Sequence, residues 1–164
     1  MLMRSVLIIL LLGHLSVGVG YASEFADRIV VKKSERKLLL MNSGKIMREM
    51  KVSLGLRPDG DKEAEGDFRT PEGEYVLDRR NNSSDYFLSV GISYPNTADR
   101  LQAEKQGVNP GGHIMIHGLP NEPRHEVRYY LNVDWTDGCI AVSNADMVDI
   151  WRLTNLYTPI SILP

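Results

Sequence analysis

The amino-acid sequence predicts a mainly β fold, a sandwich or half-barrel of short strands with one or two short helices. After residue 22, short apolar stretches alternate with turn-forming residues, a pattern typical of strands and not of long helices. The 164 residues are 43% hydrophobic and 24% charged, which is enough for one domain with its own core. The net charge of -2 and the absence of a basic run longer than Lys32-Lys33 argue against nucleic acid as a partner.

The first 22 residues have the pattern of a secretory signal peptide. Arg4 precedes an apolar run at residues 6–12, and a stretch of small residues ends at Ala22. The apolar run is shorter than the roughly 20 residues that a membrane span needs. We therefore predict a signal peptide over residues 1–22 and a mature domain over residues 23–164. An uncleaved N-terminal anchor is the alternative, and cleavage would leave a protein that is not integral to the membrane.

The first half of the mature domain reads as a meander of strands. Three strands are predicted, over residues 28–32, 37–41 and 45–53. We expect them to pair antiparallel, as at the start of a sandwich or half-barrel. A polar loop over residues 54–66 follows, and Thr70-Pro71-Glu72-Gly73 forms a turn before a strand over residues 74–77.

The second half adds the predicted helices. Residues 81–85 read as a turn-rich linker and residues 86–94 as a strand. Thr97 is placed to cap a short polar helix that ends at Gly107, and Ser143 to cap a second helix with an apolar face. The remaining predicted strands are residues 113–117, the short apolar run after Cys139, and residues 160–162.

Cys139 is the only cysteine, so it is an inert buried thiol, a partner for another chain or a chemical group. It follows the polar turn Thr136-Asp137-Gly138, where a strand begins at a surface, which favours a chemical group. A histidine such as His117 can deprotonate a thiol and later protonate a leaving amine. Gly138 has no Cβ, so the amides of Gly138 and Cys139 can approach a carbonyl oxygen and form an oxyanion hole.

The strand over residues 113–117 raises a rival interpretation. Because side chains alternate along a strand, His113, Met115 and His117 share one face. Two histidines on one face, together with Cys139, would suit a zinc site. The sequence has no His-Glu-x-x-His helix and no second cysteine, so we predict neither a metal nor a cofactor.

His117-Gly118, followed by Thr136-Asp137-Gly138-Cys139-Ile140, resembles the signature of the YkuD-type L,D-transpeptidase catalytic domain. Thr70-Pro71-Glu72-Gly73 resembles the strand entry of this family, and Pro110-Gly111-Gly112 precedes the histidine strand as it often does there. The resemblance extends from about Arg28 to Ile162, and the Asp-Trp-Thr-x-Gly-Cys-Ile-Ala-Val version is similar to the ErfK/YafK-like subgroup.

This resemblance implies an exported cysteine enzyme of the periplasm or cell envelope that acts on peptidoglycan stem peptides. Cys139 would attack the carbonyl of a diaminopimelate residue in a tetrapeptide stem, with His117 as general base and then general acid. D-alanine would leave, and an amine of a second stem or a lysine of an envelope protein would take the acyl group. The backbone of Gly138 and Gly118 would support the oxyanion. The resemblance also implies substrate contacts, at Lys62 and at Thr136, Asp137, His113 and Arg128.

Two positions depart from the commonest pattern of the family. Asp137 lies where many members have a second histidine, and Ala141 lies where many have an arginine. One alternative is therefore a hydrolase with the same site, which would use water to trim peptidoglycan or to release a protein linked to it. Another is a wall-binding module in which Cys139 is structural. A papain-like protease is disfavoured, because that family places its cysteine before its histidine.

Overall fold

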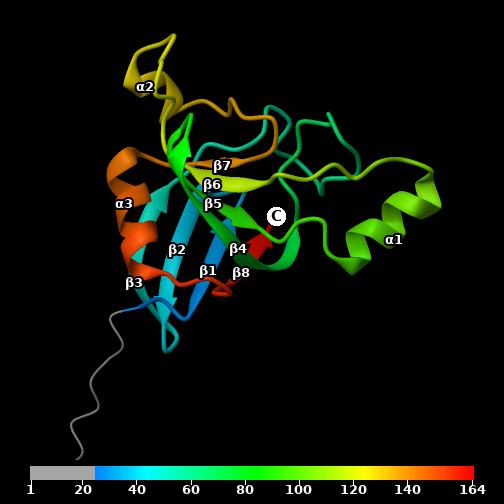
Figure 1. Cartoon of the computed structure of the whole chain (residues 1–164), viewed down its shortest axis with the longest axis horizontal. Coiled ribbons are helices and arrows are strands. Elements are labelled where there is room, and N and C mark those ends of the chain that lie inside the picture. The colour runs from blue at the N-terminus through cyan, green and yellow to red at the C-terminus, as the bar shows by residue number, and fades with distance from the viewer. Residues whose placement is uncertain (1–24) are drawn as a thin grey trace, which may run out of the picture.

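Eight strands form one continuous sheet in the computed structural model of the protein, which describes residues 25–164 (Figure 1). Their order in the sheet is β3-β2-β1-β8-β4-β5-β6-β7. The mainly β prediction is confirmed, whereas the predicted signal peptide lies outside the described residues. The strands are β1 (Arg28–Lys32), β2 (Lys37–Asn42), β3 (Lys45–Lys51), β4 (Gly73–Ser84), β5 (Phe87–Ile92), β6 (Met115–His117), β7 (Ile140–Ala141) and β8 (Pro159–Leu163).

The predicted N-terminal meander is present, since β1 pairs antiparallel with β2 and β2 with β3. The last strand, β8, then inserts parallel to β1 and antiparallel to β4. Its residues Ile160 and Ile162 are almost fully buried and join the core. The two ends of the described chain are thus held together in the middle of the sheet.

The long strand β4 connects the two parts of the sheet. Residues 73–76 pair with β8, and residues 77–84 pair with β5. The register shifts between Leu77 and Arg79 and again between Asn81 and Ser84, and such bulges bend a strand. The predicted linker over residues 81–85 is therefore wrong up to Ser84, because pairing with β5 keeps this polar segment extended.

Three helices occur in the described part of the chain: α1 (Thr97–Gln106), α2 (Val127–Tyr130) and α3 (Asn144–Leu153). The N-cap of α1 is Asn96 and not Thr97, because Asn96 and Asp99 satisfy each other's backbone amides in a capping box. Ser143 caps α3 as predicted. The four-residue helix α2 was not predicted.

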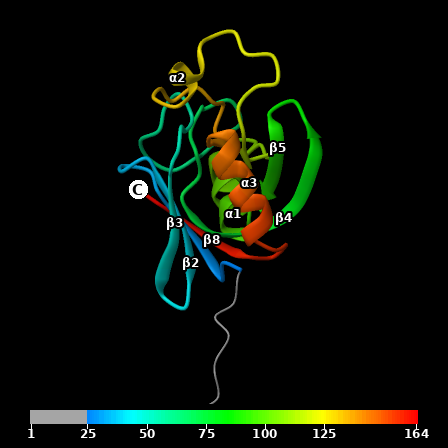
Figure 2. The same ribbon diagram turned by 90° about the vertical axis from the view of Figure 1, so that its left-hand side faces the viewer.

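Helix α3 covers the core, and Figure 2 shows it in front of the sheet, with β2 and β3 on one side and β4 and β5 on the other. Its Met147 and Ile150 are fully buried in the core cluster. Helices α1 and α2 lie at opposite ends of the molecule (Figure 1). No helix within residues 25–164 is long and apolar enough to cross a membrane.

Candidate active site

Two neighbouring strands bring Cys139 and His117 to one face of the sheet. β6 and β7 pair in parallel, with Ile116 opposite Ile140 and His117 opposite Ala141. Ile116 and Ile140 are fully buried in the core. Because side chains alternate, His117 lies on the other face. Cys139 precedes Ala141 by two residues and so shares the face of His117.

That face borders a cavity of about 280 Å³. Five predicted site residues line it: His113, His117, Thr136, Asp137 and Cys139. The sequence interpretation missed five other lining residues, which are Ser84, Tyr86, Ser89, Met115 and Trp135. The strand predicted over residues 113–117 is shorter than expected, because β6 begins only at Met115 and His113 has a φ of +58°.

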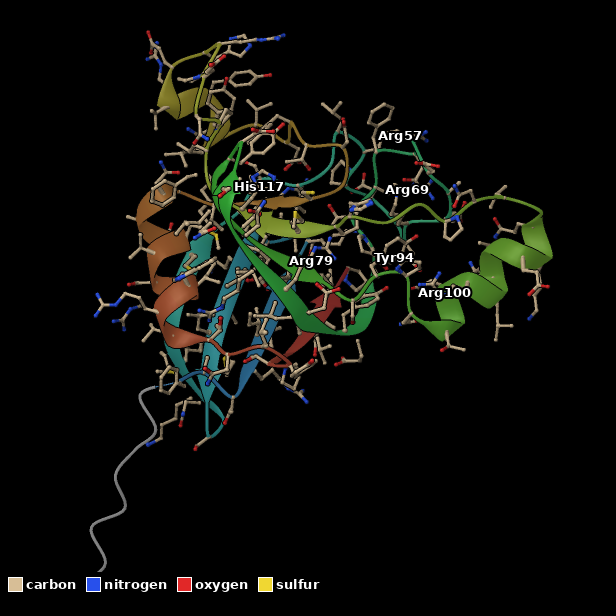
Figure 3. The ribbon with its side chains drawn as sticks, viewed as in Figure 1. Arg57, Arg69, Arg79, Tyr94, Arg100 and His117 are labelled. Carbon is tan, nitrogen blue, oxygen red and sulfur yellow. The ribbon has the colours of Figure 1, made fainter. Side chains whose placement is uncertain are left out.

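The His117 ring is buried and fixed in orientation (Figure 3). Its Nδ1 lies 2.7 Å from the Gly118 carbonyl oxygen, so Nδ1 carries the proton and Nε2 is left as an acceptor. Tyr86 and Trp135 contact the ring, with centroid distances of 4.6 Å and 5.5 Å. Burial lowers the pKa of His117 to about 4, and the hydrogen bond to Gly118 only partly opposes this. The imidazole is therefore neutral at neutral pH.

The Cys139 thiol is protonated in the resting site. Its Sγ lies 3.6 Å from the His113 carbonyl oxygen, to which the thiol donates. Burial raises the pKa of Cys139, a hydrogen bond from the Met115 backbone opposes the rise, and the negative charge of Asp137 adds to it. The thiol therefore needs a base before it can act as a nucleophile.

The turn before Cys139 is built by Thr136 and requires glycine at position 138. The Thr136 hydroxyl donates to the Cys139 carbonyl at 2.7 Å and accepts from the Gly138 N–H at 3.2 Å. Gly138 has a φ of +131°, and a Cβ there would lie 2.6 Å from the Arg69 carbonyl oxygen. Thr136 thus acts within the turn, and the Gly138 amide expected in the oxyanion hole is already engaged.

The N–H of Gly118, which was also expected to support the oxyanion, is likewise already engaged. Its N–H donates to the carbonyls of Tyr86 and Leu88, both at 3.1 Å, so it does not serve as an oxyanion donor. Its carbonyl instead holds Nδ1 of His117. A Cβ at this position would lie 2.6 Å from Oδ1 of Asn144, which explains the glycine.

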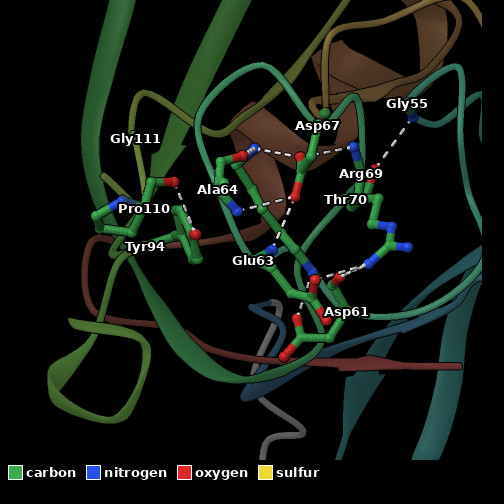
Figure 4. A network of polar contacts seen from close by, with 12 residues as sticks. Gly55, Asp61, Glu63, Ala64, Asp67, Arg69, Thr70, Tyr94, Pro110 and Gly111 are labelled. Carbon is green, nitrogen blue, oxygen red and sulfur yellow. Dashed lines mark hydrogen bonds and ion pairs between the residues drawn. The ribbon is translucent and has the colours of Figure 1, made fainter. Parts of the chain in front are cut away.

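The loop that supports Gly138 is held by a buried polar network (Figure 4). Lys62 donates to Asp67 at 2.7 Å, and both side chains are largely buried. Burial raises the pKa of Asp67, but hydrogen bonds from Lys62 and three backbone amides outweigh burial and hold that pKa below its usual value. The expectation that Lys62 meets a substrate carboxylate is wrong, because Asp67 and the Ala64 carbonyl already occupy its ammonium group.

A second, larger cleft of about 780 Å³ adjoins the cavity and shares Tyr86 and Trp135 with it. A series of aromatic contacts leads away from His117, since Trp135 packs on Tyr130 at 5.1 Å and Tyr130 on Tyr129 at 5.4 Å. Tyr129 and Tyr130 belong to α2 and line the cleft. Two rings therefore form the wall between the Cys-His cavity and a wide surface cleft.

Arg128, like Lys62, is a predicted site residue that the structure places outside the cavity. It lies on α2, is highly exposed, pairs with Glu126 at 2.8 Å and lines neither the cavity nor the cleft. Nor do three or more histidine, cysteine, aspartate or glutamate side chains gather into a metal-binding group anywhere in residues 25–164. His113, His117 and Cys139 thus share a cavity without forming the zinc site considered above.

The bent eight-stranded sheet, with a histidine on β6 and a cysteine directly before the parallel strand β7, defines a domain of the L,D-transpeptidase fold class. The model of the family described as YkuD, L,D-transpeptidase catalytic domain, matches residues 26–162. The chain therefore belongs to this family.

Sequence and structure comparisons agree with this assignment. The chain is 37% identical over 92 residues to YafK of Escherichia coli (strain K12). The match covers 55% of this chain and 32% of YafK. The helical cell shape determining protein Pgp2 from Campylobacter jejuni superposes with a TM-score of 0.63 and 29% identity, over 82% of this chain and 46% of Pgp2. An L,D-transpeptidase from Mycobacterium smegmatis shares the fold, with a TM-score of 0.55 and 13% identity, over 84% of this chain and 58% of that one. The chain thus spans only part of the length of these relatives.

Proposed function

We propose that this protein is a cysteine acyltransferase that acts on peptidoglycan stem peptides, with Cys139 as nucleophile and His117 as its base. The observation that carries the proposal is the shared cavity. It holds a protonated thiol directly before β7 and a neutral imidazole on β6 whose Nε2 is left as an acceptor. Membership of the L,D-transpeptidase family supplies the substrate class.

In the first half-reaction, Nε2 of His117 takes the thiol proton while Sγ attacks the carbonyl carbon of the donor. The carbonyl electron pair moves onto oxygen and returns as the carbon–nitrogen bond breaks. The proton on Nε2 then passes to the departing amine, which leaves an acyl thioester on Cys139. The protonated Nδ1 donates to Gly118, and this bond fixes the tautomer that both transfers require.

The N–H of Cys139 is the donor that stabilises the oxyanion. The N–H of Gly138 already donates to the Thr136 hydroxyl, and the N–H of Gly118 already donates to the carbonyls of Tyr86 and Leu88. The part of the stem beyond the reacting bond passes over Tyr86 and Trp135 into the larger cleft. That cleft has room for a second stem or for a segment of a peptidoglycan-linked envelope protein.

Hydrolysis at the same site is the second candidate function. Asp137 is the only acidic or basic side chain other than histidine among the described residues that line the cavity, so no lysine or arginine there binds a substrate carboxylate. Ala141, at the position where many family members have arginine, is buried, and its N–H donates to the Ser53 carbonyl. Water as the acceptor needs no cationic subsite, so this lining also suits an amidase or carboxypeptidase.

Mass spectrometry of the products separates the two functions. The mature protein is incubated with disaccharide-tetrapeptide stems and, separately, with stems that carry a linked envelope-protein peptide. A cross-linked dimer that Cys139→Ala does not form would establish acyl transfer. Trimmed stems or released peptide without a cross-linked product would establish hydrolysis. If Cys139→Ala turned over at the wild-type rate, the mechanism would be wrong. A Cys139→Ala protein that kept its full biological effect would instead favour the wall-binding alternative.

Export is a separate part of the proposal. A signal peptide over residues 1–22 would direct the domain to the periplasm, where peptidoglycan lies. The intact mass of the protein recovered from a periplasmic extract tests this, because cleavage after Ala22 leaves a chain that begins at Ser23.

A further inference from the structure

Ser89 is a buried polar residue to which the mechanism above gives no role. It lies on β5, is 1% exposed and lines the same cavity as His117 and Cys139. Its hydroxyl has no hydrogen-bond partner within residues 25–164. Other buried serine hydroxyls are paired: that of Ser53 donates to the Tyr130 carbonyl and that of Ser161 to Glu74.

The sheet register places Ser89 directly beside His117. β5 and β6 pair antiparallel with Ser89 opposite His117, so their side chains share a face with Cβ atoms about 4.5–5.5 Å apart. Cys139 directly precedes β7, the strand that pairs with β6 on its other edge. The three residues therefore come from three successive parts of the sheet, with β6 in the middle, and all three line one cavity.

An unpaired buried hydroxyl is unfavourable in the free protein, and the surrounding fold does not use it. The hydroxyl lines a cavity, so a ligand that fills the cavity can supply the missing partner. Because a hydroxyl both donates and accepts, Ser89 can bind an N–H, a carbonyl or a water.

We propose that the Ser89 hydroxyl binds the amine side of the scissile amide, and this inference rests on the function proposed above. The reacting carbonyl carbon must lie next to Cys139, and the nitrogen that receives the proton must lie next to Nε2 of His117. Ser89 lies opposite His117 in the sheet and lines the cavity that also holds the thiol, so its hydroxyl can reach a nitrogen that lies next to Nε2. Its oxygen accepts a hydrogen bond from the departing N–H and so turns the nitrogen lone pair toward Nε2.

The same contact serves the second half-reaction, in which the acyl thioester reacts with an amine or water. The acceptor occupies the position that the first amine vacated and donates one hydrogen to Ser89 and another to Nε2. The nitrogen or oxygen of the acceptor bonds to the acyl carbon, the carbon–sulfur bond breaks, and the proton on Nε2 returns to Sγ.

Ser89→Ala tests the proposal with two matched donors, one with the natural scissile amide and one in which sulfur replaces the scissile N–H. Acylation of Cys139 is followed by intact mass. We expect Ser89→Ala to slow acylation by the amide roughly 3- to 10-fold, the effect of one neutral hydrogen bond. The thioester has no N–H and its thiolate leaves without a proton, so it should acylate both proteins equally. The melting temperature of Ser89→Ala should not fall, since no hydrogen bond is lost.

Ser161→Ala is the matched control, because it removes a buried, paired hydroxyl at β8; it should lower the melting temperature and leave the amide-to-thioester rate ratio unchanged. If Ser89→Ala slowed acylation by the amide and by the thioester equally, the role of Ser89 would be merely structural. If the wild type and Ser89→Ala were acylated by the amide at the same rate, Ser89 would have no role. Either result overturns the assignment. A wild-type chain that neither donor acylates would overturn the proposed function itself, a result that is distinct from both.

Discussion

The neutral state of buried His117 makes the stability of the fold depend on pH. The ordinary pKa of 6.5 falls to about 4 in the folded chain, mainly through burial. Since each pKa unit is equivalent to about 1.4 kcal/mol, the difference corresponds to about 3 kcal/mol. The folded pKa lies below the unfolded one, so the unfolded chain binds the proton first as pH falls. This contribution is therefore present above pH 6.5 and is lost between pH 6.5 and about 4.

Urea unfolding of the wild type and of His117→Gln, followed by tryptophan fluorescence, measures the effect. Glutamine does not titrate and keeps an N–H that can donate to Gly118. As pH falls from about 7.5 to about 4.5, the wild type should lose about 2.5 kcal/mol more free energy of unfolding than His117→Gln loses. His125→Gln is the control, because that ring is exposed near α2, and this variant should follow the wild type.

A difference between wild type and His117→Gln that stays constant within about 0.5 kcal/mol over this range would refute the reasoning. It would mean that burial does not hold the imidazole neutral. A thiolate–imidazolium pair would then become the starting point for the chemistry, in place of a thiol and a neutral base.

Three further predictions concern the supports of the site. Gly138→Ala would place a Cβ 2.6 Å from the Arg69 carbonyl oxygen at a φ of +131°. Urea unfolding should show that this variant loses more than about 2 kcal/mol of free energy of unfolding. A loss below about 0.5 kcal/mol would contradict the geometry. Lys62→Met leaves the Asp67 carboxylate without its ammonium partner and should cost about 3 kcal/mol, so an unchanged melting temperature would show that the pair is dispensable. Because the pKa of Cys139 is raised above 9.0, its alkylation by iodoacetamide without substrate should accelerate most steeply above pH 9, and full reactivity already at a pH of about 7 would contradict this.

Much of the fold was predictable because its signals are local. Alternation and turn residues located the first three strands and the last, and Ser143 located the start of α3. The errors occur where tertiary pairing outweighs local preference. Residues 81–84 are polar and turn-prone, yet they extend β4 because β5 supplies their backbone partners. His113 fits the alternation of its strand, but its positive φ ends the extended backbone before β6.

The site was predictable only in part, for the same reason. Cys139 and His117 stand in a motif, and strand parity explains why both reach one cavity. Ser89 and Tyr86 lie about 30 residues before His117 in the sequence and enter the site through the β5–β6 region. No sequence period reveals that register. A serine within an otherwise apolar strand was the only signal for Ser89, and it was too weak to distinguish a buried from an exposed hydroxyl.

Two polar groups at the cavity are in position before a substrate binds, and in the proposed mechanism they explain how a neutral site can be reactive. The hydroxyl of Ser89 has no hydrogen bond within residues 25–164, and the bond of Nδ1 to Gly118 leaves Nε2 of His117 as an acceptor. Groups that are fixed in place before the substrate arrives need little reorganisation during the reaction, which is where preorganised sites gain their effect. A thiol whose pKa is raised by burial and by Asp137 reacts poorly with electrophiles that fail to engage those groups. In the proposed mechanism, a stem peptide that engages them would draw the thiol from the His113 carbonyl toward the imidazole, so that occupancy of the cavity, and not the resting charge of Cys139, would control when the nucleophile forms.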